Sequence, residues 1–273
     1  RTMTAARHED VTAARATTAE DRLLAIIFPL ALFVLWAVAT EGGLVGANIL
    51  PTPSSTARTL VYLFSSGEIW SHLAASLGRV VSGAALGAGL GLALGVALGL
   101  SQRARDYLLP SFQVFVYVPI LAWLPILMLL LGLGETLKIV LVAKAAFTPV
   151  TLTAFSAIRD VPTAYVELGR VNGLKPAERL FGIVLPAALP SIWAGLRYAH
   201  SRAWTALLIV ELLASSEGLG FIMVEGQQLL QLDVQIAAIL VLAVVGVALD
   251  QLLAIPERRV ARWRGAGFHG AAA

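Results

Sequence analysis

The stretch that decides the fold is residues 76–100, SLGRVVSGAALGAGLGLALGVALGL. Beyond Arg79 it contains no charged residue as far as Leu100. An α-helix needs about 20 consecutive apolar residues to cross a hydrocarbon core of about 30 Å. A bilayer offers the backbone no other hydrogen-bond partners, so even a glycine-rich segment stays helical there. This stretch therefore predicts a transmembrane helix.

Glycine recurs at every fourth position of this segment. The five glycines are Gly83, Gly87, Gly91, Gly95 and Gly99. Residues four apart lie on nearly the same face, because an α-helix has 3.6 residues per turn. A face without side chains lets another helix approach closely. We expect this stripe to pack against a helix of the same chain; a subunit interface or a surface that slides during gating is the alternative.

The rest of the chain has the same character, with 58% hydrophobic and only 14% charged residues and a mean hydropathy of +0.80. A soluble domain carries about 25% charged residues. We therefore expect an all-α, polytopic membrane protein with about six transmembrane helices. The predicted spans are 23–40, 76–100, 108–131, 137–157, 188–213 and 234–255, within a transmembrane domain of residues 23–256. A lead of residues 1–22 and a tail of residues 257–273 flank this domain.

Most of the 20 lysines and arginines lie in the lead, in the 101–107 loop, in a long loop of residues 158–187 and in the tail. Positive charge stays on the cytoplasmic side during insertion, so we expect both termini and these two loops to be cytoplasmic. This accounts for a pI near 9.5 without a nucleic-acid partner. The chain has no cysteine and four scattered histidines, which excludes thiol chemistry and predicts no metal site. No catalytic residues are predicted either.

The 158–187 loop carries a spaced motif. It reads Glu167-Leu168-Gly169, then Gly173 after three residues, then Ile183, Leu185 and Pro186 after nine more. This resembles the signature E-A-A-x3-G-x9-I-x-L-P of permeases in binding-protein-dependent ABC importers, with Leu168 and Gly169 in place of the two alanines. The stretches 50–53 (LPTP), 132–135 (GLGE) and 218–220 (GLG) look like the nitrate/sulfonate/taurine subfamily of those permeases.

The resemblance implies a type I ABC importer-like permease fold in a bacterial inner membrane. It implies that the first helix of the loop is a coupling helix that docks into an ATPase subunit, with Glu167 bracing the contact. The implied partners are two ABC ATPase subunits, a solute-binding protein, a second copy of the permease and membrane lipid. The implied substrate is a small anion of the sulfonate, taurine, nitrate or bicarbonate class. The alternative for the loop is an ordinary amphipathic segment on the lipid surface.

Local signals give the loop a shape. Pro162 suits the first turn of a helix, and Gly173 suits the left-handed position after a helix end. Pro176 can begin a second helix, which we expect to stop before Pro186. The chain contains no G-x-x-x-x-G-K-[ST] sequence, so it has no P-loop of its own. We expect no cofactor in this chain, with ATP and Mg on the partner subunits.

Charged residues inside the spans are costly and need a reason. Lys144 and Arg202 lie at comparable depths of roughly 10–17 Å in the fourth and fifth spans. Together with His200, which points elsewhere from Arg202, they depart from the apolar or small residues usual in the resembling permeases. We predict that they belong to the substrate pathway and attract an anion. The alternative is internal pairing with Glu211 or Asp250.

The remaining charged residues, and the chain as a whole, allow other roles. Arg197 is expected to be structural. Glu217 and Glu225, in the last outer loop, could meet a basic patch on a solute-binding protein, although exposed carboxylates usually do nothing specific. An ion-driven secondary transporter would favour intramembrane carboxylates and an inverted repeat. A membrane enzyme would show clustered catalytic groups. The sequence shows neither clearly.

Overall fold

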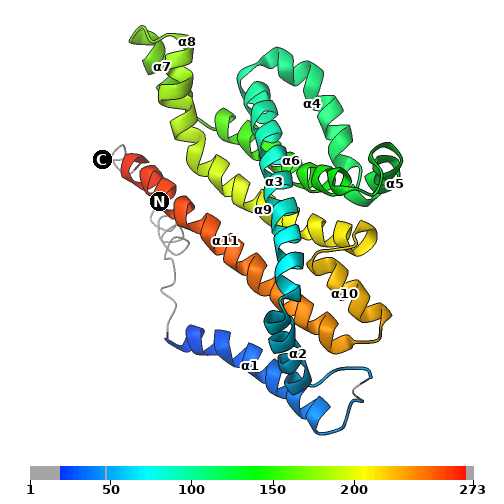
Figure 1. Ribbon diagram of the computed structural model, residues 1–273. Coiled ribbons are helices and arrows are strands. Elements are labelled where there is room, and N and C mark those ends of the chain that lie inside the picture. Colours follow the sequence, from blue (N-terminus) through cyan, green and yellow to red (C-terminus); the bar gives the residue numbers. More distant parts are fainter. Residues whose placement is uncertain (1–18, 47, 269–273) are drawn as a thin grey trace, which may run out of the picture. The chain divides into compact units, whose positions relative to one another are not determined.

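The computed structural model describes residues 19–46 and 48–268, and every regular element in that part of the chain is helical (Figure 1). The chain divides into two units, residues 1–58 and 59–273. In the first unit, α1 (Ala19–Glu41) contains Trp36, whose indole Nε1 donates to the Pro51 carbonyl at 3.0 Å. The helix α2 (Pro53–Ser66) begins in the first unit and ends in the second.

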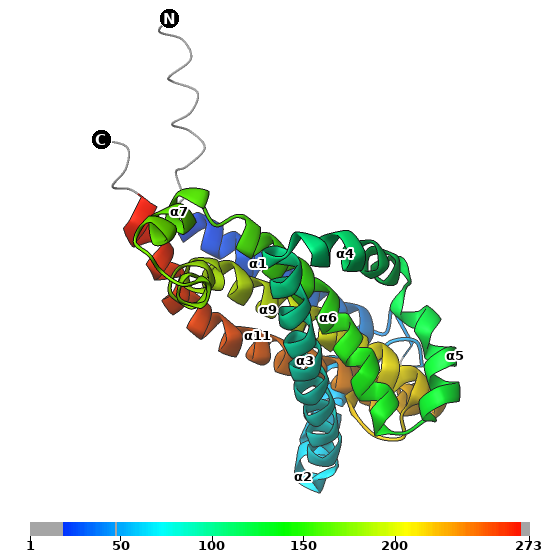
Figure 2. The same cartoon turned by 90° about the horizontal axis from the view of Figure 1, so that it is seen from above.

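The second unit is built on three long helices, α3 (Glu68–Leu100), α6 (Glu135–Arg159) and α9 (Leu185–Ala214). The most extensive interface joins α3 to α6 and the next joins α6 to α9. Apolar residues of α6, such as Val142 and Val150, form one core with Ala199 and Ala203 of α9. In both views α4 and α5 lie on the side of α6 away from α11 (Figures 1 and 2).

The glycine stripe is the reason why α3 and α6 lie so close. A Cβ added at any of the five stripe glycines would overlap an atom of α6. At Gly83 it would lie 2.7 Å from Val142, and at Gly95 2.7 Å from Ala154. The stripe therefore packs within the chain, as its spacing led us to expect.

The predicted third span is not a single helix. It consists of α4 (Gln102–Tyr117) and α5 (Ile120–Leu131), which are bent by 96° at the break between them. Pro119 has no N–H to continue the helix, and its ring pushes the preceding residue out of the helical region. Val118 is accordingly extended, with φ −75° and ψ 114°. The predicted span over residues 108–131, with its internal Pro119 and Pro125, thus corresponds to the end of α4, the break and α5.

Four of the described helices are long and apolar enough to cross a membrane, and the bent pair makes up to five. They are Glu68–Leu100, Glu135–Arg159, Pro176–Ala214 and Leu232–Arg258. The predicted first span, 23–40, falls in α1, whose described apolar part is Ile26–Glu41 and is shorter than 18 residues. The described residues thus do not reach six full spans. Most of the predicted lead lies outside them, and the predicted tail begins inside α11 (Leu232–Phe268).

The 158–187 loop folds as a helix, an elbow and a second helix. The first helix is α7 (Thr163–Val171), followed by Gly173 in the left-handed conformation at φ +74°. Leu174 N donates to the Gly169 carbonyl at 3.0 Å, which is the long bond of a Schellman motif. The second helix, α8 (Pro176–Arg179), then begins as expected.

This second helix does not stop before Pro186. The chain continues through a π-helical turn, Leu180–Val184, directly into α9. Pro186 sits in the first turn of α9, where a missing N–H does not interrupt the α-helical ladder. The 158–187 loop is therefore continuous in helical structure with a membrane helix at its C-terminal end. In Figure 1, α7 and α8 lie at one end of α9 and α10 (Leu219–Gln228) lies at the other.

Candidate functional site

Lys144 and Arg202 face one cavity. Its volume is about 570 Å³, and it lies between α6, α9 and the break that separates α4 from α5. Lys144 and Thr148 line it from α6, and Tyr198, Arg202 and Thr205 line it from α9. These residues are spaced three or four apart on each helix, which puts them on one face. Of the described residues that line the cavity, two are cationic and none is acidic.

The Lys144 ammonium group is directed at the break in the bent span. Its Nζ donates to the Val118 carbonyl at 3.2 Å. It also lies 4.8 Å from the centre of the Phe115 ring and 5.7 Å from that of Trp123. Aromatic faces attract a cation at such distances. Phe115 belongs to α4 and Trp123 to α5, so one ammonium group touches both arms of the bent span.

Among the described residues, neither Lys144 nor Arg202 forms an ion pair with a carboxylate. The two acids suggested as their partners are occupied elsewhere: Glu211 pairs with Arg79 at 2.9 Å and Asp250 with Arg197 at 2.6 Å. The pairing alternative is therefore not what the structure contains. Arg197 also pairs with Glu257 at 2.8 Å and holds α9 to α11, as a structural arginine would.

His200 does not share this cavity. It is two positions from Arg202, about 200° around the helix, and it is absent from the cavity lining. Its Nε2 atom is buried and has no hydrogen-bond partner among the described residues. The structure thus brings together two of the three predicted pathway residues and separates the third.

Some motif residues of the 158–187 loop are buried or half-buried, and others are exposed to solvent. Gly169 is buried, and a Cβ there would lie 2.7 Å from Ile183 Cδ1. Glycine in place of the family's alanine therefore lets α7 lie closely on the π turn. Ile183 and Leu185 are half-buried, whereas Glu167 and Pro186 are exposed. Two bulky apolar side chains of α7 also point outward: Leu168 is 61% and Val171 85% exposed.

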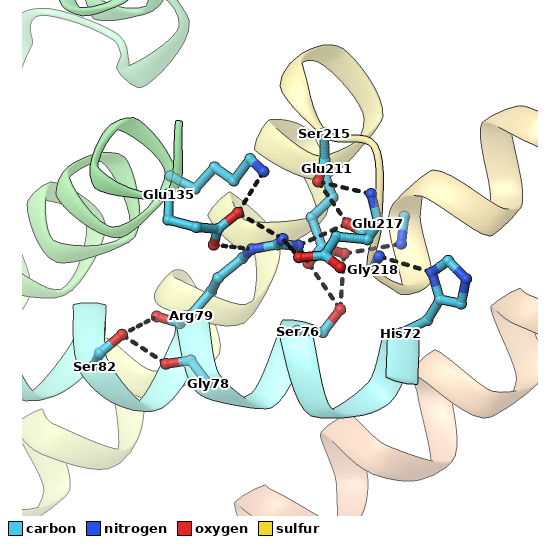
Figure 3. Close-up of polar contacts among 12 residues, drawn as sticks. His72, Ser76, Gly78, Arg79, Ser82, Glu135, Glu211, Ser215, Glu217 and Gly218 are labelled. Carbon is cyan, nitrogen blue, oxygen red and sulfur yellow. Dashed lines mark hydrogen bonds and ion pairs between the residues drawn. The ribbon is translucent and has the colours of Figure 1, made fainter. Parts of the chain in front are cut away.

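A third group of residues was not predicted from the sequence. We call it the Arg79 cluster; it consists of Ser76, Arg79, Glu135, Lys138, Glu211 and Glu217. Figure 3 shows how Glu135, Glu211 and Glu217 surround Arg79. Arg79 donates to the Glu135 carboxylate at 2.6 and 2.8 Å, to Glu211 at 2.9 Å, and to the Glu217 carbonyl and carboxylate at 2.7 and 3.0 Å. All five of its N–H donors are thereby used. Lys138 pairs with Glu135 at 2.6 Å, and Ser76 donates to Glu211 at 2.8 Å.

The Arg79 cluster joins three helices at the end of α6 and α9 that is distal to the 158–187 loop. Arg79 and Glu211 are almost fully buried, at 2% and 1% exposure. A signal was present in the sequence, since both are charged residues inside predicted spans. Their pairing could not be found there, because they are 132 positions apart.

The family model for the inner membrane component of binding-protein-dependent transport systems matches residues 71–262. The chain belongs to this family. Members are the membrane-spanning permease components of importers that work with a binding protein. The matched range contains the cavity, the Arg79 cluster and the 158–187 loop. A gradient-driven carrier is not favoured by this match.

Curated relatives align along nearly the whole permease. It is 38% identical over 239 residues to the aliphatic sulfonates transport permease protein SsuC of Bacillus subtilis (strain 168), an alignment that covers 88% of this chain and 87% of that protein. It is 34% identical to the taurine transport system permease protein TauC of Escherichia coli (strain K12), over 86% of each chain.

Solved structures support the fold of the permease. A chain of the MetNI methionine ABC transporter, crystallised in an inward facing conformation, matches with a TM-score of 0.61 and 18% identity. That match covers 68% of this chain and 93% of the MetNI chain. At this level of identity the likeness concerns the architecture alone. It agrees with the predicted type I importer permease fold.

Proposed function

We propose that this permease forms the translocation pathway for a small organic sulfonate, of the aliphatic sulfonate or taurine class, in an ATP-driven importer. The observation that carries the proposal is the cavity lined by Lys144 and Arg202 without an acidic residue. A sulfonate presents three acceptor oxygens, and ammonium, guanidinium and hydroxyl groups are all donors to such an anion. The names of relatives at 34–38% identity support the same chemical class.

The size of the cavity supports a compact solute. Its volume of about 570 Å³ lies in the range of small-molecule sites. Polar lining comes from Tyr198, Thr148 and Thr205, while Ile120 and Ile209 supply an apolar wall. This division suits a molecule with a charged head and a short aliphatic tail. The smaller anions nitrate and bicarbonate can use the same donors but have no tail to fill the apolar part of the cavity.

The second part of the proposal concerns coupling. The outward-pointing Leu168 and Val171 make an apolar stripe on α7 beside the exposed Glu167. A short helix with such a stripe suits a groove in another protein. The absence of a side chain at Gly169 lets α7 pack closely on the π turn, which continues into α9 and so to the cavity lining. A displacement of α7 by a bound ATPase subunit would therefore be transmitted to α9 and to the cavity.

In this proposal the working complex contains two copies of the permease, two ATPase subunits that bind ATP and Mg, and a solute-binding protein. The permease itself hydrolyses nothing. It lies in a bacterial inner membrane with its termini and the 158–187 loop on the cytoplasmic side. The positive-inside distribution of lysine and arginine supports this orientation.

Uptake into proteoliposomes tests the pathway. The complete complex is reconstituted, and uptake of radiolabelled taurine and ethanesulfonate is measured with ATP. We expect the double variant Lys144→Met/Arg202→Met to abolish uptake while the complex still assembles. Arg103→Gln, which removes an exposed cation of α4 outside the cavity, is the matched control and should transport normally. Full uptake by the double variant would end the proposal.

ATPase measurements test the coupling. We expect hydrolysis only when the permease is combined with its ATPase subunits, and altered hydrolysis in Glu167→Ala and Gly173→Asp. Asp at position 173 would have to adopt φ +74°, which glycine tolerates more readily. Silent substitutions together with no bound ATPase subunit would refute the importer assignment.

A further inference from the structure

The bent span α4–α5 is fastened firmly at its two ends. At its start, Arg105 donates to the carbonyls of Leu98 and Gly99 at 3.0 and 3.2 Å, which ties α4 to the end of α3. At its far end α5 leads into Glu135, which pairs with Arg79 (Figure 3) and with Lys138. Both anchors are multiple and charge-assisted, so both are strong.

Between those anchors the span is held mainly by partly buried apolar side chains, such as Trp123 and Leu124 of α5, which pack against Leu141 of α6. Phe112 is the one buried residue of α4, and α5 has none. The helices behind them are held differently: α3 packs closely on α6 at the five glycines of the stripe, and the Arg79 cluster ties both helices to α9. The bent span is thus tied at both ends to helices that pack closely on one another.

Lys144 adds a polar contact at the middle of the bent span, where the ring centres of Phe115 and Trp123 already lie 5.1 Å apart across the break. Its ammonium group donates to the Val118 carbonyl at 3.2 Å. Val118 ends α4, so its carbonyl has no helical N–H to accept from. Phe115 and Trp123, on the two sides of the break, share the same ammonium group at 4.8 and 5.7 Å. The contact spans both arms and the break at once.

The same ammonium group lines the cavity assigned above to an anionic solute. A carbonyl and two ring faces are neutral partners, and an oxyanion is a stronger one for a cation. We propose that Lys144 is a hinge clamp: it fixes the angle between α4 and α5 in the empty cavity, and a bound anion draws it off Val118 and releases the bend. This inference rests on the proposed function for the identity of the anion.

The proposal gives Lys144 a positioning role that Arg202 lacks. Arg202 lines the same cavity from α9 and contacts neither α4 nor α5 through any hydrogen bond or ion pair among the described residues. Removing either cation should weaken uptake. Only the loss of Lys144 should change the bend in the absence of solute.

The experiment uses the fact that the chain contains no native cysteine. Spin labels are placed on Tyr107→Cys in α4 and Leu129→Cys in α5, whose native side chains are 79% and 87% exposed. The labelled permease is purified with its ATPase subunits in lipid nanodiscs, diluted with unlabelled permease so that most complexes carry one labelled copy. Pulsed electron paramagnetic resonance then gives the distance across the bend, with and without ethanesulfonate.

We expect one main distance in the empty wild-type complex and a second, distinct distance with ethanesulfonate. Lys144→Met should show the second distance without any solute, whereas Lys144→Arg, which keeps a cation, should stay at the first. Arg202→Met should keep the wild-type distance when empty. Identical distances in empty wild type and empty Lys144→Met would overturn the clamp even if uptake is lost. An altered bend in empty Lys144→Met, together with a wild-type complex that takes up neither sulfonate, would instead uphold the clamp and refute the proposed substrate.

Discussion

Substitution of Gly87 by alanine is the sharpest test of how this permease is packed. The ideal Cβ at position 87 would lie 2.9 Å from the Ala143 carbonyl carbon and closer still to its oxygen. These are backbone atoms of α6, so no side chain can turn aside to make room. Overpacking of a close-packed site lowers the free energy of unfolding by roughly 1–3 kcal/mol. Because the backbone cannot move aside, we expect Gly87→Ala to lower it by about 3 kcal/mol.

The same helix supplies a matched control. Gly89 lies two positions away, is exposed, and has nothing within 4 Å of its ideal Cβ. Gly89→Ala therefore adds the same methyl group without an overlap. Alanine is also the better helix former by about 0.5–1 kcal/mol. We expect Gly89→Ala to be neutral or slightly stabilising.

The measurement is the unfolding equilibrium of each purified variant, titrated with SDS in lipid micelles and followed by circular dichroism. A loss of about 3 kcal/mol changes the ratio of folded to unfolded chain by about 150-fold at a fixed SDS fraction. Equal stability of Gly87→Ala and Gly89→Ala would refute the assignment of the stripe to the α3–α6 interface. It would favour an interface with lipid or with a second copy instead.

Two further substitutions test the cluster and the loop. Glu211→Gln removes one of the three carboxylates that pair with the buried Arg79 and should cost about 1–3 kcal/mol in the same titration, whereas Glu225→Gln, outside the cluster, should cost nothing measurable. Gly169→Val would collide with Ile183 and lift α7 from the π turn. We expect it to uncouple ATP hydrolysis from uptake in the reconstituted complex; tight coupling at the wild-type ratio would contradict the role given to this contact.

The sequence by itself determined the class of the protein. Hydropathy fixes which segments can cross a bilayer, since the cost of burying polar groups is a local sum over about 20 residues. The spacing of Gly83 to Gly99 determined a helix face without side chains, because helical periodicity is also local. Gly173 and Pro176 determined the elbow of the 158–187 loop for the same reason. The signature that includes Glu167 then indicated a permease of an ABC importer.

Only the tertiary structure decided which groups meet. The partner of the glycine stripe and the set of residues that line the cavity depend on neighbours distant in the chain. The clearest case is Glu211. Once Arg79, 132 positions away, takes this carboxylate, Lys144 and Arg202 have no acid to pair with and face the cavity together. Charge pairing over such separations follows from how the helices pack, and no local pattern in the sequence carries that information.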